Sequence, residues 1–327
     1  MTQSFSGFTQ TIEQTWHPAV EAWLDLNTSH KVPERVEIIR ETHTSKASVY
    51  RLSGVGINDT GVIAKRCDKQ RAMLDRKFYE EVLPYIPLPA AHYYGYLEAD
   101  LEYSWLFLED VGNVNYSPNC DEDTKLALHW MTIFHTSIDL IPEIKSLPDR
   151  GLSYYLVHLR SGRETILRNL NNPALESEDL DLLGKIVSQC DLIEDKWDKM
   201  ASICSILPET LTHGDFKKKN IFIRSGMGIA ELIVVDWETA GLGLPTVDVA
   251  ESKVAVTAYW SLVSAAWSNL NQDSFQNLVE VGRIFRYLSA INWAAESLSF
   301  TWLSKPMAKM NVYHSRIAGA LQALQIE

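Results

Sequence analysis

Hydrophobic positions follow two different patterns along the 327-residue chain. In the first third, short runs of β-branched and aromatic residues lie between turn residues, a pattern that predicts strands. We expect strands at residues 34–41, 47–52, 62–66, 91–97 and 104–108. Apolar residues between Phe8 and Leu26 recur at helical spacing and predict a helix before the first strand, and Gln70–Val82 should form another.

The rest of the chain is predicted to be mostly helical. A helix capped by Asp121 should run to about Leu140, and two more helices should occupy 155–205. The acidic run Glu176–Asp179 between those two is typical of an exposed helix cap. The most apolar stretch, Val254–Trp267, is short and interrupted by hydroxyl residues, which favours a buried helix over a membrane span.

One predicted hairpin carries the side chains that most suggest chemistry. Two β-branched runs, Ile221–Arg224 and Leu232–Val235, flank a short turn that contains glycine. Because hairpin strands are antiparallel, Asn220 before the first run and Asp236 after the second should lie close together. Both offer the oxygen ligands that magnesium prefers, and Asp215 lies in the loop that leads to Asn220. Turn chemistry alone is the alternative explanation for the Asp and Asn of this loop.

Composition and charge narrow the class of protein. An apolar fraction of 46% and an aromatic fraction of 10% are typical of a folded globular protein, and 327 residues suit two lobes. The formal net charge of −12 disfavours binding to nucleic acid or to an anionic membrane, and it is compatible with a cationic substrate.

The cysteines and the N-terminus point to a cytoplasmic protein. The chain has 4 cysteines that form no Cys-x-x-Cys pair, so reduced thiols are a simpler interpretation than a zinc site or a disulfide framework. The first residues lack a basic segment followed by an apolar one, and we therefore expect no signal peptide.

The loop and the hairpin together resemble a known family. His213-Gly-Asp215-x4-Asn220 and Asp236-Trp-Glu238 are similar to the motifs of the aminoglycoside phosphotransferase and choline kinase-like family of small-molecule kinases. The resemblance implies an α+β, two-lobed, protein-kinase-like fold. An N-lobe with a small antiparallel sheet, residues 1–109, would bind the nucleotide, and a mostly helical C-lobe, residues 110–327, would hold the catalytic loop and the acceptor.

The family pattern implies a lysine and an acidic partner in the N-lobe. Lys65 ends a Val-Ile-Ala-Lys run, close to the kinase strand whose lysine contacts the α- and β-phosphates. A solvated lysine on an edge strand is the alternative. In the family a Glu precedes a Phe-Tyr pair by three residues, whereas this chain has Asp75 there. We expect Asp75 to pair with Lys65, with Glu80 and Glu81 as alternatives.

Further nucleotide contacts are implied with less sequence support. The polar loop after the first strand, with Ser45 and Ser48, could offer hydroxyl and amide groups to the phosphates, although a polar hairpin tip explains it equally well. The run Trp105–Val111 resembles the family's hinge, where main-chain groups bind the adenine edge. This places Glu109 and Val111 beside the base.

The phosphoryl-transfer template gives each remaining residue a role. Asp215 would orient and deprotonate the acceptor hydroxyl, and Lys217 would neutralise charge on the transferred group. Asn220 and Asp236 would bind Mg²⁺, and ATP or GTP would be the donor. Only a short segment follows Asp236 before the next helix, with no Ala-Pro-Glu motif, which favours a small molecule over a protein as acceptor.

The acceptor site should lie among the C-terminal helices, which are rich in aromatic residues. Aromatic side chains could hold a cationic acceptor, although at helical spacing they are more often core. A noncatalytic nucleotide-binding scaffold with the same fold is the competing hypothesis, because fold does not fix function.

Overall fold

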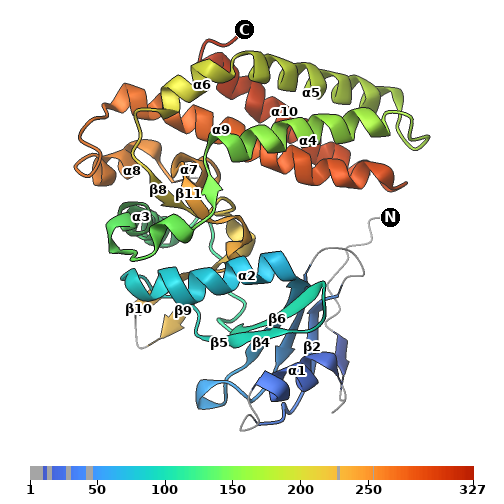
Figure 1. The fold of residues 1–327 in the computed structure, drawn as a ribbon, viewed down its shortest axis with the longest axis vertical. Coiled ribbons are helices and arrows are strands. Elements are labelled where there is room, and N and C mark those ends of the chain that lie inside the picture. The colour runs from blue at the N-terminus through green and yellow to red at the C-terminus, as the bar shows by residue number, and fades with distance from the viewer. Residues whose placement is uncertain (1–9, 13–16, 27–30, 42–46, 227–228, 253) are drawn as a thin grey trace. The chain divides into compact units, whose positions relative to one another are not determined.

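The computed structural model describes residues 10–12, 17–26, 31–41, 47–226, 229–252 and 254–327. It divides into two compact units (Figure 1). The first consists of Met1–Asn115 and Ile221–Glu238, and the second of Tyr116–Asn220 and Thr239–Glu327.

The first unit contains a six-stranded antiparallel sheet in the order β1-β2-β3-β4-β6-β5. Its strands are β1 Gln10–Ile12, β2 Val36–Arg40, β3 Ser48–Leu52, β4 Val62–Asp68, β5 Tyr93–Glu98 and β6 Tyr103–Glu109. The five predicted strands are therefore present with small differences at their ends. The helical elements are α1 Pro18–Leu26, η1 Ile57–Asp59, α2 Lys69–Lys77, a π-helical turn η2 Phe78–Val82, and η3 Leu83–Tyr85.

Helices α1 and α2 cover opposite faces of this sheet (Figure 1). Trp23 of α1 packs against side chains such as Leu52 and Phe107, which alternate with residues of the other face. On that other face, Ala72 of α2 packs against Cys67 of β4.

The predicted helix from Phe8 to Leu26 is wrong at Gln10–Ile12, and residues 8–9 and 13–16 lie outside the described part of the chain. Gln10–Ile12 is a strand that pairs with β2, and the helix begins only at Pro18. Proline has no N–H and is tolerated at the first helical position but not in a helix interior, so Pro18 marks a start. The ring nitrogen Nδ1 of His17 accepts a hydrogen bond from the Ala19 N–H at 3.1 Å and caps this end.

The predicted hairpin is present, with β9 at Ile221–Gly226 and β10 at Ile229–Val234. Ile221 pairs with Val234, so Asn220 directly precedes, and Asp236 closely follows, the paired ends. The hairpin belongs to the first unit, whereas the expected N-lobe ended at residue 109. The N–H of Ile223 donates to the Val114 carbonyl at 2.8 Å, which ties β9 to the segment after β6.

The second unit is mostly helical. Its helices are α3 Asp121–Thr136, α4 Leu152–Asn169, α5 Ser177–Asp195, α6 Trp197–Cys204, α7 Thr246–Ser252, α8 Val256–Val263, α9 Gln272–Ala295 and α10 Ser304–Ala323. A small sheet is formed by β7 Asp149–Arg150, β11 Gly241–Gly243 and β8 Thr210–Thr212. Short helical turns are η4 Ile138–Leu140, η5 Ile144–Ser146, η6 Lys218–Asn220, η7 Trp237–Thr239 and η8 Glu296–Ser299.

Three details of these helices differ from expectation and one agrees. Helix α3 ends at Thr136, and its N-cap is Cys120 rather than Asp121, which lies in the first turn. Region 155–205 holds parts of three helices instead of two. Glu176 is the cap of α5, where it forms a capping box with Asp179, as the acidic run indicated.

Helix α9 is the core of the second unit, because it is buried on nearly all sides and packs on α4, α7 and α10. Aromatic residues of the C-terminal helices contribute to this core, including Tyr259, Phe275 and Phe285. Within the described residues, no helix has the length and apolar character needed to span a membrane.

Candidate functional site

Lys65 lies in the middle of β4, where strand alternation determines its direction. Val62 and Ala64 belong to the core beneath α1, whereas Cys67 packs against α2. Because side chains on a strand alternate between faces, Lys65 shares the face of Cys67. Only 8% of Lys65 is exposed, so it is not a solvated edge-strand lysine.

The ammonium of Lys65 is held by two carboxylates of the first unit. Its Nζ lies 2.6 Å from Oδ2 of Asp75 and 2.6 Å from Oδ1 of Asp236. The other oxygen of Asp75 accepts the main-chain N–H of Trp237 at 2.5 Å. Asp75 therefore links the lysine to the turn that follows β10.

Small residues lie where α2 packs against the sheet. Ala72 of α2 packs with Cys67 and Ala47, and all three are buried. Small side chains permit a close approach of helix and sheet, which suits an acid one methylene shorter than Glu. The alternative partners lie elsewhere: Glu80 pairs with Arg76 and Glu81 pairs with Lys77.

Electrostatics keep Lys65 charged in this environment. Burial alone would lower its pKa, but Asp236 and Asp75 outweigh burial and raise the pKa of Lys65 well above its usual value. Burial and the charge of Asp236 raise the pKa of Glu238, which lies 3.9 Å from Nε of Arg71. Three carboxylates, those of Asp75, Asp236 and Glu238, therefore face two positive side chains, Lys65 and Arg71. A further cation would balance the charge.

The main chain at Asp236 is in the left-handed region, with φ of +73°. For a residue other than glycine this conformation costs roughly 1–2 kcal/mol, although Asp tolerates it better than most. Next to it, the ring of Trp237 stacks on Phe78 at 5.1 Å between centroids, and both rings are buried. The packed Trp237 ring and its bond to Asp75 hold Asp236 in this conformation.

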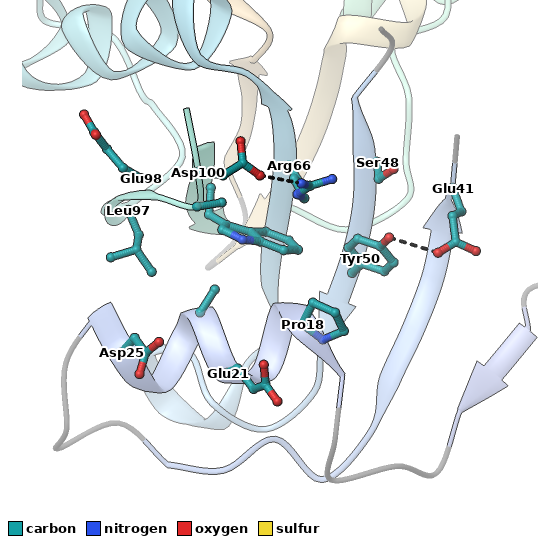
Figure 2. Close-up of a pocket in the computed structure, with 13 residues that line it drawn as sticks. Pro18, Glu21, Asp25, Glu41, Ser48, Tyr50, Arg66, Leu97, Glu98 and Asp100 are labelled. Atoms are coloured by element: carbon teal, nitrogen blue, oxygen red, sulfur yellow. Dashed lines mark hydrogen bonds and ion pairs between the residues drawn. The ribbon is translucent and has the colours of Figure 1, made fainter. Parts of the chain in front are cut away.

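Ser48 lies on the other face of the sheet from Lys65. It pairs with Arg66 in the ladder, and with Tyr50 and Glu41 it lines a cavity of about 570 Å³ beneath α1 (Figure 2). The ladder places Val49, not Ser48, opposite Lys65. The expectation that the Ser48 side chain contacts the phosphates is therefore not supported by its position, and Ser45 lies outside the described residues.

Glu109 and Val111 differ in whether their main-chain groups take part in the sheet. The N–H of Glu109 donates to the His92 carbonyl at 2.8 Å, and its carboxylate pairs with Arg224 of β9 at 2.8 Å. Val111 follows the sheet in an irregular, partly exposed segment. Its main chain takes no part in the described ladder of the sheet.

In the second unit, Asp248 of α7 organises the loop after β8. Its carboxylate accepts the N–H of His213 at 2.7 Å and the N–H of Gly214 at 2.8 Å. It also accepts the Thr212 hydroxyl at 3.1 Å and lies 3.0 Å from Nε2 of His135. Burial would raise the pKa of Asp248, but the hydrogen bond from His135 and the N–H of His213 outweigh it and lower that pKa.

Gly214 is required by the shape of this loop. Its φ is +75°, and a Cβ at this position would lie 2.7 Å from the carbonyl oxygen of Thr239. The Thr239 hydroxyl in turn donates to the His213 carbonyl at 2.8 Å. The loop therefore has one tightly defined path into Asp215.

His135 is a buried core histidine. Its Nδ1 lies 2.6 Å from the hydroxyl of Tyr259 and its Nε2 faces Asp248. It supports the loop through Asp248 and has no contact with Asp215 among the described interactions.

The carboxylate of Asp215 is held on both oxygens. Oδ2 accepts Nδ2 of Asn220 at 3.0 Å, and Oδ1 lies 2.5 Å from Nζ of Lys217 and 2.8 Å from Nη2 of Arg286. Lys219 is further away, at 3.6 Å from Oδ2. The structure thus brings together three of the predicted residues, Asp215, Lys217 and Asn220, within one loop.

Arg286 was not predicted from the sequence. It comes from α9, 71 residues after Asp215, and carries no motif. The available signal was a lone charged residue in the apolar run Ile284–Leu288, because arginine is rarely buried unless it is paired.

The positive charges in this group influence one another. Burial, reinforced by Arg286 and Lys219, lowers the pKa of Lys217 despite the nearby Asp215. Nζ of Lys217 and the guanidinium carbon of Arg286 both lie over the Trp293 ring, at 5.8 Å and 5.5 Å from its centroid.

Two predicted metal ligands have suitable chemistry. The Nδ2 group of Asn220 donates to the Asp215 main chain and side chain, which leaves Oδ1 as the acceptor end of the amide. Asp236 is partly exposed and carries a carboxylate. Among the described residues no three His, Cys, Asp or Glu side chains form a metal-binding group. Magnesium is usually held by one or two carboxylates plus substrate phosphates, so these donors fit it.

Comparison with known proteins gives one family. The sequence model described as "Phosphotransferase enzyme family" matches residues 47–284, which is more than half of the chain. No curated protein matches the chain in sequence.

Solved structures show the same fold at low identity. A choline kinase from Cryptosporidium parvum Iowa II covers 94% of this chain and 94% of its own, with 12% identity and a TM-score of 0.59. The microcompartment-associated aminopropanol kinase covers 94% of this chain and 97% of its own, with 14% identity and a TM-score of 0.61. The structure of APH(2")-IIia in a complex with GDP and kanamycin covers 90% of this chain and 97% of its own, with 13% identity and a TM-score of 0.59. The predicted α+β kinase-like fold is confirmed.

Proposed function

The chain belongs to the phosphotransferase enzyme family, and we propose that it moves the γ-phosphoryl group of ATP or GTP to a hydroxyl of a small molecule. The names of similar structures support a small acceptor, since they include kinases of choline and aminopropanol. The observation that carries the proposal is the carboxylate of Asp215, which Asn220 orients from within the same tightly held loop.

The first unit would bind the nucleotide. Lys65, kept charged by Asp75 and Asp236, would contact the nonreacting phosphates. Main-chain groups at Glu109 and Val111 would meet the edge of the base. Replacement of the Lys65–Asp236 contact by a contact to phosphate would free the Asp236 carboxylate for Mg²⁺.

The second unit would perform the proton transfer. Asp215 would accept the proton of the acceptor hydroxyl as its oxygen attacks the γ-phosphorus and the bond to the β-phosphate oxygen breaks. Lys217 would neutralise the charge on the oxygens of the transferred group. Asn220 and Asp236 would hold magnesium, which supplies charge neutralisation on the phosphates.

The test is ADP release in a screen of hydroxyl compounds with Mg²⁺ and ATP or GTP. Asp215→Asn should lower turnover by about 10²–10⁴-fold, the usual contribution of a general base, with nucleotide binding unchanged. Asp236→Asn should weaken nucleotide binding in Mg²⁺ more than in EDTA. Asp195→Asn, an exposed acid of α5, is the matched control and should change neither quantity.

The outcome also separates the competing hypothesis. A noncatalytic nucleotide-binding protein would show nucleotide-dependent thermal stabilisation without turnover of any acceptor, and Asp215→Asn would then have no kinetic effect. Turnover close to that of the wild type in Asp215→Asn would remove Asp215 as the base.

A further inference from the structure

Arg286 occupies an unusual place for an arginine. It lies in the most buried part of α9 and is only 4% exposed. Among the described residues its one ion pair is with Asp215, through Nη2. An arginine this deeply buried is rarely retained without further partners.

Most of the donors of this guanidinium have no acceptor. Nε and Nη1 are shielded from solvent and have no hydrogen-bond partner in the described part of the chain. A guanidinium offers five N–H donors in a planar fork that matches a carboxylate or phosphate. Because unpaired buried donors cost free energy, an anion at this fork would be stabilised.

The charges around Asp215 also favour an anion. Arg286, Lys217 and Lys219 lie within 4 Å of one carboxylate, so positive charge is in excess. The two lysines belong to the loop itself and suit the transferred phosphoryl group. Arg286 comes instead from α9, and its field reaches His158 of α4: burial, Arg150 and Arg286 lower the pKa of that histidine to about 4.

A cationic acceptor would bind poorly beside Asp215. The aromatic ring of Trp293 beside this group already has Lys217 and Arg286 over its face. Like charges would repel a cationic acceptor there.

We propose that Arg286 is a specificity-determining residue, whose unpaired N–H groups bind an anionic group, carboxylate or phosphate, on the hydroxyl acceptor. This inference rests on the proposed function and names the class of acceptor: a small alcohol that carries a negative charge. The net charge of the chain had instead suggested compatibility with a cation. The anion would share Arg286 with Asp215 and so place the hydroxyl near the base.

The experiment uses matched acceptors that differ only in the anionic group. For the carboxylate arm these are L-serine against ethanolamine and D-glycerate against ethylene glycol. For the phosphate arm the pair is glycerol 3-phosphate against glycerol. ADP release with Mg²⁺ and ATP gives kcat/KM for each compound. We expect at least one anionic member to exceed its partner by about 10- to 100-fold, as a charged hydrogen bond would give.

The variants test whether Arg286 carries this preference. In Arg286→Gln the ratio of kcat/KM between the anionic compound and its partner should fall towards one. Loss of the contact to Asp215 should lower kcat/KM for both compounds alike, so the ratio reports recognition of the anionic group. Arg286→Lys should restore part of the ratio, since it keeps the charge without the fork. Arg283→Gln, one turn earlier on α9 and paired with Glu280, should leave the ratio unchanged. A melting temperature for each variant checks folding.

Each other result overturns the inference. It is wrong if the uncharged or cationic members are turned over as fast, if no anionic member is turned over, or if Arg286→Gln keeps the ratio. Failure of the proposed function is recognisable separately, as absence of ADP release with every compound together with absence of magnesium-dependent nucleotide binding.

Discussion

The carboxylate of Asp75 accepts hydrogen bonds from the ammonium of Lys65 at 2.6 Å and from the main-chain N–H of Trp237 at 2.5 Å. One side chain therefore connects the middle of β4 with the turn after β10. The lysine is thereby held in place by contacts within the first unit.

Asp75→Asn should weaken both the fold and nucleotide binding. Asn keeps the shape but loses the charge, and we expect a loss of about 2 kcal/mol of unfolding free energy, because hydrogen bonds to charged groups are worth roughly 1.5–3 kcal/mol. Urea denaturation and nucleotide titration measure the two effects. Glu80→Gln, in the neighbouring turn and 37% exposed, is the control and should change stability by less than about 0.5 kcal/mol. Equal effects of the two substitutions would contradict the role of Asp75.

Gly214→Ala should disrupt the loop after β8. The new Cβ would collide with the Thr239 carbonyl in a left-handed conformation, and we expect a cost of at least about 1–2 kcal/mol and a large loss of turnover. Gly319→Ala on α10 is the matched control, since its Cβ meets no atom within 4 Å and alanine favours a helix by up to about 1 kcal/mol. Circular dichroism melts and ADP release compare them. A neutral Gly214→Ala would show that the loop can adopt another path.

The lowered pKa of His158 should make the free energy of unfolding depend on pH. Burial, followed by Arg150 and Arg286, lowers its pKa in the folded chain to about 4, from an ordinary 6.5. Between these values the unfolded chain binds a proton that the folded chain does not, so the stabilisation is complete above pH 6.5 and is lost as the pH falls towards 4. Between pH 7.5 and pH 5 the free energy of unfolding should therefore decrease by about 2 kcal/mol.

His158→Gln removes this titration. Its unfolding free energy, measured by urea denaturation at the two pH values, should therefore decrease less than that of the wild type. An identical decrease in both proteins would show that His158 is not responsible.

Lys217→Met should reduce turnover more than nucleotide binding. Removal of a positive group that stabilises charge in the transition state typically costs about 10²–10³-fold in kcat. The exposed neighbour Lys218→Met changes the same net charge and is the control. A matching loss in both variants would indicate a general field effect instead of a contact by Lys217.

The sequence was informative where a residue's role is local. The loop from His213 to Asn220 is continuous, so its motif could be recognised in the sequence, and the family resemblance is confirmed by the match over residues 47–284. The strands and the hairpin followed from alternation and turn chemistry.

What the sequence left open depends on packing and register. Ser48 was one possible phosphate contact, but which face a residue occupies follows from pairing between strands, and the ladder places Ser48 opposite Arg66. Arg286 lies on a distant helix, and only the tertiary fold brings it to Asp215. The start of α1 could have been predicted, since Pro18 is a local signal that helical spacing alone had hidden.

The small residues packed between α2 and the sheet determine which acid fits at position 75. A glutamate there would push the helix outward, and a bulkier residue in place of Ala72 would pull the aspartate away from Lys65. Positions 75 and 72 should therefore change together in descendants of this chain, a long acid with a wider spacing and a short acid with a narrow one.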